Sequence, residues 1–375
     1  MIPFIDLQAQ RKRIEPEINA AIQKVLEHGT YIMGPEVAEF EKDLQSFCGA
    51  KHAISCSDGT DAISLALMAL GITAGDAVIV PSFTFASTAE VVALIGATAV
   101  FADTDPRTFN VSPVSVISAI ETAKKQGLTP KAIISVDLFG LPADYDTLEI
   151  IARDYGLTLI CDSAQGFGGV YKGRTTGSIG DITTTSFFPA KPLGCYGDGG
   201  AVFTNRDDLA DILRSLKVHG KGTDKYDNIR IGLNSRLDTL QASILIEKLK
   251  IYADEIEKRN VVAQKYSDGL HDIVETPFVP EGLTSVWAQY TLLLPENIDR
   301  GAFMASLKDK NVPSVVYYPK PLHQQTAYKH FPSAKDGLPV CEDQSRRVVS
   351  LPMHPYLTEG EIDQVIDAVR QGLGT

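Results

Sequence analysis

Several features that would point to other classes of protein are scarce or missing in this chain of 375 residues. Its cysteines are few and scattered, and no two of them stand at the spacing of a metal site or a disulfide framework. An odd number of such cysteines is typical of reduced thiols in a cytosolic protein. The cysteines are Cys48, Cys56, Cys161, Cys195 and Cys341.

Long apolar runs are also missing. The longest, such as residues 89–97, are too short and too interrupted to span a bilayer. The N-terminal residues lack the basic-then-apolar order of a signal peptide. We therefore expect a cytoplasmic protein with no membrane partner.

Positive charge is in deficit, because 35 lysines and arginines stand against 47 aspartates and glutamates, a net charge of −12. Nucleic acids and anionic membranes are therefore poor partners. Residues 214–236 are the exception and could bind an anionic small molecule, although a solvated loop explains the same pattern. The basic side chains there are Arg214, Lys217, His219, Lys221, Lys225, Arg230 and Arg236.

Two common catalytic signatures are absent. No Gly-x-Gly-x-x-Gly run follows an apolar strand, so nothing supports a dinucleotide-binding fold. No Gly-x-Ser-x-Gly elbow or Ser/His/Asp arrangement supports a serine hydrolase.

Short apolar runs alternate with helix-like segments from about residue 50 to about residue 220. Strands that are apolar on both faces and alternate with helices predict a mostly parallel sheet covered on both sides. Ligands bind such sheets beyond the carboxyl ends of the strands. The expected strands cover residues 52–57, 77–80, 99–102, 132–136, 158–161, 183–188 and 201–204.

The second half of the chain has a different pattern. Residues 237–266 predict one long helix, and the shorter elements after about residue 275 are divided by many prolines. A final apolar-periodic helix is expected over residues 359–373. We expect a large domain of residues 1–245 that includes an N-terminal arm. A smaller α+β domain of residues 246–375 would follow, linked to it by the long helix.

Lys191 and Asp162 are the most informative residues. Lys191 stands between Pro189 and Pro192 and precedes a glycine-rich turn, and Asp162 closes an expected strand. Pyridoxal phosphate (PLP) chemistry needs such a pair, because a lysine holds the cofactor as a Schiff base and a carboxylate keeps the pyridine nitrogen protonated. An exposed loop lysine is the alternative interpretation.

Other motifs could supply the rest of a PLP site. Residues 57–60 join a strand to a helix and could hold a phosphate at the helix N-terminus, or merely cap the helix. Ser186 could add a hydroxyl to the same phosphate. Phe83 or Phe85 could stack on the pyridine ring, although core packing explains either one alone. Gln165 could donate a hydrogen bond to the ring's phenolic oxygen.

Together these motifs resemble the DegT/DnrJ/EryC1/StrS family of PLP-dependent nucleotide-sugar aminotransferases over nearly the whole chain. The resemblance implies an aspartate-aminotransferase-like α/β fold (type I PLP fold), whose large domain has a mostly parallel seven-stranded sheet. The segments that carry it are residues 4–8, 29–37, 57–62, 81–85, 162–165, 186–191, 197–200, 234–238, 317–319 and 350–354.

The resemblance also implies site residues and a homodimer with shared active sites. Lys191 and Asp162 would be catalytic, and Asn234 would reach the cofactor phosphate of the neighbouring subunit. The residues expected to bind the cofactor are Gly59, Thr60, Phe85, Asp162, Gln165, Ser186, Lys191 and Asn234. The residues expected to bind the substrate are His219, Arg236, Tyr317 and Tyr318.

The implied activity moves an amino group from L-glutamate, through pyridoxamine phosphate (PMP), to a nucleotide-linked keto sugar. Residues 187–200 and 234–241 look most like the branch that aminates C3 of UDP-2-acetamido-2-deoxy-3-oxo-glucuronate for surface polysaccharide or lipopolysaccharide synthesis. Arg236 could meet the carboxylate of that sugar.

Three alternatives remain at this point. Tyr317-Tyr318 replaces the His-Tyr pair expected in that branch, and a tyrosine carries no positive charge near neutral pH. A neutral 3-keto or 4-keto 6-deoxy sugar on dTDP or UDP is therefore the second candidate substrate. A PLP dehydratase of the same fold would carry a histidine at position 191, and a non-catalytic regulator would be expected to lose Lys191, Asp162 or the phosphate seat.

Overall fold

The computed structural model describes residues 2–224 and 226–374. Its largest sheet has seven strands in the order β1-β9-β8-β5-β4-β2-β3. Neighbouring strands run parallel except at β9, which is antiparallel to both β1 and β8. The predicted mostly parallel sheet is therefore confirmed. Its strands are β1 (His52–Cys56), β2 (Asp76–Pro81), β3 (Thr98–Ala102), β4 (Thr129–Val136), β5 (Thr158–Asp162), β8 (Ile182–Ser186) and β9 (Gly200–Thr204).

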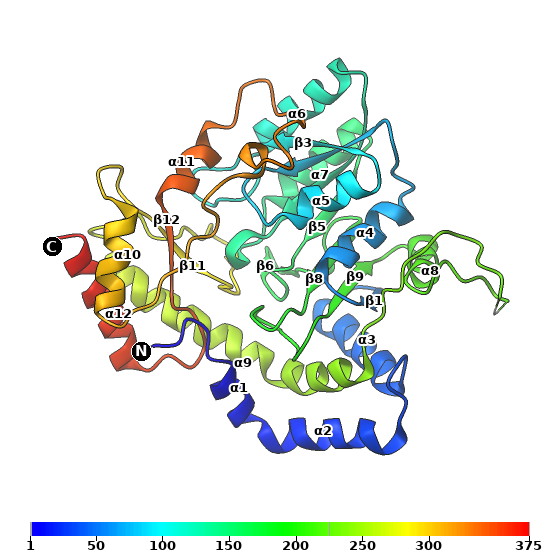
Figure 1. Ribbon diagram of the computed structural model, residues 1–375, viewed down its shortest axis with the longest axis horizontal. Coiled ribbons are helices and arrows are strands. Elements are labelled where there is room, and N and C mark those ends of the chain that lie inside the picture. Colours follow the sequence, from blue (N-terminus) through cyan, green and yellow to red (C-terminus); the bar gives the residue numbers. More distant parts are fainter. Residues whose placement is uncertain (1, 225, 375) are drawn as a thin grey trace.

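Helices cover both faces of this sheet (Figure 1). Ile54 and Val202 belong to the main core, whereas their neighbours Ala53 and Phe203 belong to a core shared with α3 and the long helix α9. Successive residues of a strand point to opposite faces, so this alternation places a packed layer on each side. The covering helices are α3 (Pro35–Cys48), α4 (Gly59–Ala69), α5 (Ser87–Leu94), α6 (Pro113–Lys125), α7 (Tyr145–Tyr155) and α8 (Asp207–Leu216).

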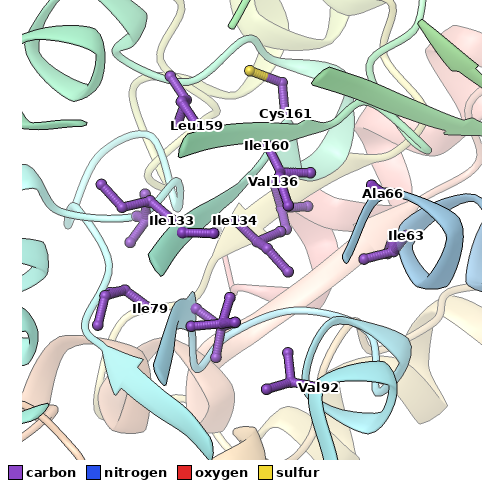
Figure 2. Packing of buried hydrophobic residues seen from close by; sticks show 14 of the residues in the cluster. Ile63, Ala66, Ile79, Val92, Ile133, Ile134, Val136, Leu159, Ile160 and Cys161 are labelled. Atoms are coloured by element: carbon purple, nitrogen blue, oxygen red, sulfur yellow. The ribbon is translucent and has the colours of Figure 1, made fainter. Parts of the chain in front are cut away.

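The main core consists largely of aliphatic side chains from the central strands. Ile134 and Val136 of β4 pack on the side of α4, where Ile63 and Ala66 lie, and Ile133 points away from them (Figure 2). All five cysteines are buried and unpaired, which confirms that they form no disulfide. The strand ends that carry the functional side chains are therefore held by a tightly packed sheet.

The predicted long helix is α9 (Thr239–Leu270), which runs along one side of the molecule with α1 (Leu7–Arg13) and α2 (Glu15–His28) beside it (Figure 1). It extends four residues beyond the predicted end and includes Gly269. A Cβ on Gly269 would lie 2.8 Å from Cδ1 of Ile366, so close packing against α12 (Glu359–Gly372) explains a glycine inside the helix.

A second core forms around the C-terminal half of α9. The antiparallel strands β11 (Tyr290–Leu293) and β12 (Val348–Leu351) contribute to it together with α12 and α10 (Arg300–Asp309). Ile2 from the N-terminal segment also packs there. The division of the chain at residue 245 stays a prediction. The remaining elements are η1 (Leu138–Gly140), β6 (Val170–Tyr171), β7 (Arg174–Thr175), β10 (Leu283–Thr284), η2 (Leu322–Gln324) and α11 (Pro339–Arg347).

Strand β8 ends at Ser186, two residues before the predicted end. The N–H of Phe187 still bonds to the carbonyl of Gly199 beside β9, but the N–H of Phe188 bonds to Oγ of Ser186, so the chain leaves the sheet there. Pro189 then has no N–H to continue a strand. Within the described residues, no helix is both long enough and apolar enough to cross a membrane.

Candidate active site

A cavity of about 820 Å³ lies where the carboxyl ends of β4, β5 and β8 meet the loop that follows β2. Parallel strands end at the same edge of a sheet, which brings together side chains that are far apart in the sequence. Most of the predicted site residues line this cavity: Gly59, Thr60, Phe85, Asp162, Gln165, Ser186, Lys191, Tyr317 and Tyr318.

Asp162 is the last residue of β5 and is only 5% exposed. Its Oδ1 accepts the N–H of Ala164 at 3.0 Å, and Oδ2 has no partner among the described residues. Burial raises the pKa of this carboxyl to about 6, and the charge of Lys191 opposes that shift. A buried carboxylate oxygen without a partner is suited to a cationic N–H donor such as a protonated pyridine nitrogen.

Lys191 lies in the loop after β8, where its backbone N–H bonds to the carbonyl of Phe188 at 2.8 Å. Lys191 lines the cavity, and its Nζ has no hydrogen-bond partner among the residues described. Burial lowers the pKa of this amine, while the nearby Asp162 partly offsets the effect. A less basic lysine has a larger fraction of neutral, nucleophilic amine at neutral pH.

The N-terminus of α4 forms a narrow seat beside Ser186. Asp58 caps the helix by accepting the N–H of Asp61 at 2.8 Å, so the capping interpretation is correct. The N–H groups of Gly59 and Thr60 have no partner in the described chain and remain available to an anion. A Cβ on Gly59 would lie 2.7 Å from Cβ of Ser186, so only glycine leaves this seat open. The available groups fit a phosphate.

The two phenylalanines after β2 have different environments. Phe83 is 1% exposed and packs in the main core, which confirms the core-packing interpretation for this residue. Phe85 is 57% exposed and lines the cavity, so its ring is available to a flat ligand.

Gln165 joins two walls of the cavity. Its Oε1 accepts the N–H of Phe139 at 2.8 Å, and its Nε2 donates to the hydroxyl of Tyr318 at 3.1 Å. Burial raises the pKa of Tyr318, which therefore stays neutral. The protein thus uses both ends of the Gln165 amide, and this amide and the Tyr318 hydroxyl face the cavity as a pair.

The sequence patterns did not single out three residues of the same cavity. Ile5 comes from the N-terminal segment, Gln289 from beside β11 and Gln325 from the loop after η2. Gln289 and Gln325 carry no periodic or motif signal, and Ile5 lies in residues 4–8, a segment of the family resemblance in which it was given no role. Only the fold brings them to the cavity.

The remaining predicted residues lie outside this cavity. Asn234 and Arg236 line a neighbouring hollow of about 440 Å³, which shares Asp198 with the main cavity. His219 lines neither of these hollows and is exposed, with its backbone N–H bonded to the carbonyl of Leu233. Arg236 is half-buried and forms no ion pair with the described residues.

The predicted basic segment needs one correction. Lys217 is buried, and its Nζ lies 2.9 Å from a carboxylate oxygen of Glu41 and 2.9 Å from the carbonyl of Ser55. It therefore stabilises packing between α8, α3 and β1 and offers no charge to a ligand. Lys225 lies outside the described residues.

The lining of the main cavity is unbalanced in charge. Lys191 is its only cationic side chain within the described chain, whereas four aspartates line it. A substrate that carries phosphate groups therefore needs positive charge from outside this cavity. The aspartates are Asp58, Asp61, Asp162 and Asp198.

Comparison with known proteins decides the family. A sequence model described as the DegT/DnrJ/EryC1/StrS aminotransferase family matches residues 12–370. The chain belongs to this family. A curated relative from Pseudomonas aeruginosa, UDP-2-acetamido-2-deoxy-3-oxo-D-glucuronate aminotransferase, is 48% identical over 98% of this chain and 99% of its own.

Solved structures support the same assignment. A DegT/DnrJ/EryC1/StrS aminotransferase from Brucella abortus is 53% identical over the full length of both chains, with a TM-score of 0.98. NtdA from Bacillus subtilis was solved with bound PMP; it is 30% identical and has a TM-score of 0.88, covering 100% of this chain and 85% of its own. The protein is therefore a PLP-dependent aminotransferase of the type I fold. The roles of its individual residues stay predictions.

Proposed function

We propose that this aminotransferase moves the amino group of L-glutamate to C3 of UDP-2-acetamido-2-deoxy-3-oxo-glucuronate, for surface polysaccharide synthesis. The observation that carries the proposal is the cavity that gathers Lys191, Asp162 and an open phosphate seat. The full-length identity of 48% to a relative named for this reaction supports the choice of sugar.

We assign the cofactor-binding roles as follows. The N–H groups of Gly59 and Thr60, with Oγ of Ser186, hold the phosphate. The free Oδ2 of Asp162 keeps a proton on the ring nitrogen. Phe85 covers one face of the ring.

PLP, when bound, supplies a conjugated ring that accepts an electron pair from the substrate carbon. Lys191 would hold the cofactor through its amine and would then move a proton between the substrate carbon that bears nitrogen and the cofactor carbon on the other side of that nitrogen. Its unpaired Nζ and lowered pKa suit both tasks, because a neutral amine can attack a carbon and accept a proton. The hydroxyl of Tyr318 and the amide of Gln165 line the cavity, where their hydrogen bonds would orient the bound cofactor or substrate.

We also propose that the enzyme is a homodimer that completes each active site with residues of the other subunit. Among the described residues, the cavity has one cationic side chain and four aspartates, so it does not by itself suit a nucleotide diphosphate. Arg236 and Asn234 line the adjacent hollow, and Arg236 has no ion-pair partner in the described residues. Supplied by a partner subunit, they would reach the phosphates, with His219 near the nucleotide.

A neutral 3-keto or 4-keto 6-deoxy sugar on dTDP or UDP is the second candidate. The specific observation in its favour is the pair Tyr317 and Tyr318 in the wall of the cavity. Burial raises the pKa of both phenols, so neither offers a charge to a sugar carboxylate. In this alternative Arg236 would serve the phosphates alone.

A half-reaction experiment separates the candidates. The purified enzyme is converted to the PMP form with L-glutamate, the donor is removed, and each keto sugar is added in turn while the visible absorbance is followed. We expect the PLP absorbance to return with UDP-2-acetamido-2-deoxy-3-oxo-glucuronate. Its return only with a 6-deoxy keto sugar would support the second candidate, and no change with L-glutamate would refute the proposed donor.

A further inference from the structure

Asp137 is a buried carboxylate beneath the floor of the cavity that the roles above do not use. It follows β4 directly and is 0% exposed. Val136 pairs with Asp162 in the parallel register of β4 and β5, and the backbone N–H of Asp137 bonds to the carbonyl of Asp162 at 3.0 Å. Two acidic residues thus stand at adjacent strand ends, one facing the cavity and one behind it.

Hydrogen bonds to Asp137 partly offset the cost of burying its ionised side chain. Its Oδ1 accepts the N–H of Ala143 at 3.0 Å and a short hydrogen bond from the hydroxyl of Tyr145. Its Oδ2 accepts a hydrogen bond from Oγ of Ser163 at 2.5 Å. Hydrogen bonds from such donors stabilise a carboxylate inside a protein, and no cation pairs with this one in the described chain.

Asp137 is also fixed against the segment that carries Asp162. A Cβ on Gly166 would lie 2.3 Å from Cβ of Asp137, so the turn of residues 163–166 rests directly on the carboxylate. Ser163, which immediately follows Asp162, is part of both this turn and the hydrogen-bond network. The charge of Asp137 is therefore held at a fixed place relative to Asp162.

We propose that Asp137 is a positioning residue whose negative charge, acting through Asp162, strengthens proton binding at the cofactor ring. The proposal rests on the placement of the ring nitrogen against Asp162 made above. A second negative charge behind Asp162 makes the loss of a proton from the ring less favourable, because this charge attracts the positive charge of the protonated ring.

The other titratable groups around Asp137 do not replace this charge. Tyr145 from α7 and Cys161 from β5 are fully buried, and burial raises the pKa of each, so both are neutral. Lys191 lies on the cavity side of Asp162. Burial raises the pKa of Asp137 itself to about 6, so it is ionised at the neutral pH of an assay.

The visible absorbance of the PLP-loaded enzyme, followed as a function of pH, tests this proposal. Asp137→Asn keeps the shape of the side chain and removes its charge. We expect the pH midpoint of the absorbance change to fall by about 1 unit, the size of an attraction between opposite charges through protein at an effective dielectric constant near 20. A purely structural role would lower stability and leave the midpoint of the folded enzyme unchanged.

Asp103→Asn is the matched control. Asp103 follows β3 as Asp137 follows β4, is also buried, and its carboxylate accepts backbone N–H groups, including that of Cys341. Asp103 does not line the cavity, so removing its charge should leave the pH midpoint of the absorbance change where it is in the parent enzyme. Equal shifts in both variants would overturn the proposal.

A second variant keeps the test decisive if Asp137→Asn does not fold. Ser163→Ala retains the carboxylate but removes one of its donors, which raises the pKa of Asp137 and leaves it less ionised near neutral pH. We expect a smaller shift in the same direction. An unchanged midpoint would overturn the proposal, whereas a parent protein that binds no chromophore would contradict the cofactor assignment itself.

Discussion

The two sides of the proposed site differ in how far their residues are exposed. Asp162 and Lys191 lie in a cavity built on strand ends, and their backbones are fixed by hydrogen bonds within one chain. Asn234 and His219 belong to the exposed segment after α8, which projects from the body of the molecule (Figure 1). In the proposed dimer, one chain would supply the chemistry, whereas recognition of an anionic substrate would depend on contact between chains.

The largest effect is expected on the cavity side. Lys191→Ala removes both the group that holds the cofactor and the group that moves the proton, so amino transfer should fall by about 10⁴-fold or more. Borohydride should no longer link the cofactor to the protein. Lys131→Ala, an exposed lysine at the opposite end of the sheet, is the control. Persistent covalent trapping in Lys191→Ala would show that another lysine holds the cofactor.

Arg236→Ala tests the other side of the comparison. We expect kcat/KM for the nucleotide sugar to fall about 100- to 1,000-fold, because charge-assisted hydrogen bonds to phosphate are lost. The half-reaction with L-glutamate should change much less. The control is Arg153→Ala, which removes an exposed arginine of α7 whose one ion-pair partner in the described part of the chain is Asp154. Equal losses in both half-reactions would argue against a role in sugar binding.

The buried charge of Asp162 should affect the stability of the cofactor-free protein. Burial raises the pKa of this carboxyl from its ordinary 3.8 to about 6. Its contribution to stability is therefore complete below pH 4 and lost as the pH rises through 6, by up to about 3 kcal/mol.

Asp162→Asn cannot ionise and should escape this loss. The free energy of unfolding of the variant minus that of the parent should therefore increase by up to about 3 kcal/mol from pH 4 to pH 7. Urea denaturation at each pH measures this difference. The exposed Asp154→Asn should show no such gain. If Asp162→Asn also shows none, the carboxyl is not held in a desolvated position.

The phosphate seat should give the smallest of these effects. Gly59→Ala places a methyl group 2.7 Å from Cβ of Ser186, so the seat must widen, and we expect PLP affinity to fall about 10-fold. Gly360→Ala is the control, because a Cβ there meets no atom within 4 Å. Equilibrium titration with PLP measures both variants. Unchanged affinity in Gly59→Ala would place the phosphate elsewhere.

The same comparison explains what could be predicted from the sequence. The cavity residues stand at the ends of apolar strands, and parallel strands bring their ends together, so local patterns sufficed to place Asp162, Ser186 and Lys191. Gln289 and Gln325 come from segments with no motif of their own, and only tertiary packing brings them to the site together with Ile5.

Other misses have local physical causes. Lys217 looked like part of a basic surface, but its ammonium group is buried against Glu41, and a one-dimensional charge pattern cannot distinguish these cases. The predicted end of β8 was two residues late, because the side chain of Ser186 bonds to the chain as it leaves the sheet. The long helix continues through Gly269, because its neighbour Ile366 takes up the space of a side chain.

Mixing two inactive variants tests the shared site most directly. Lys191→Ala and Arg236→Ala chains are unfolded together, refolded and assayed for amino transfer. In a mixed dimer, the site that holds the intact Lys191 also receives the intact Arg236. Random pairing makes about half of the dimers mixed, each with one intact site, so we expect about one quarter of the parent activity to return. A mixture no more active than its components, although dimeric, would contradict the sharing of sites between subunits.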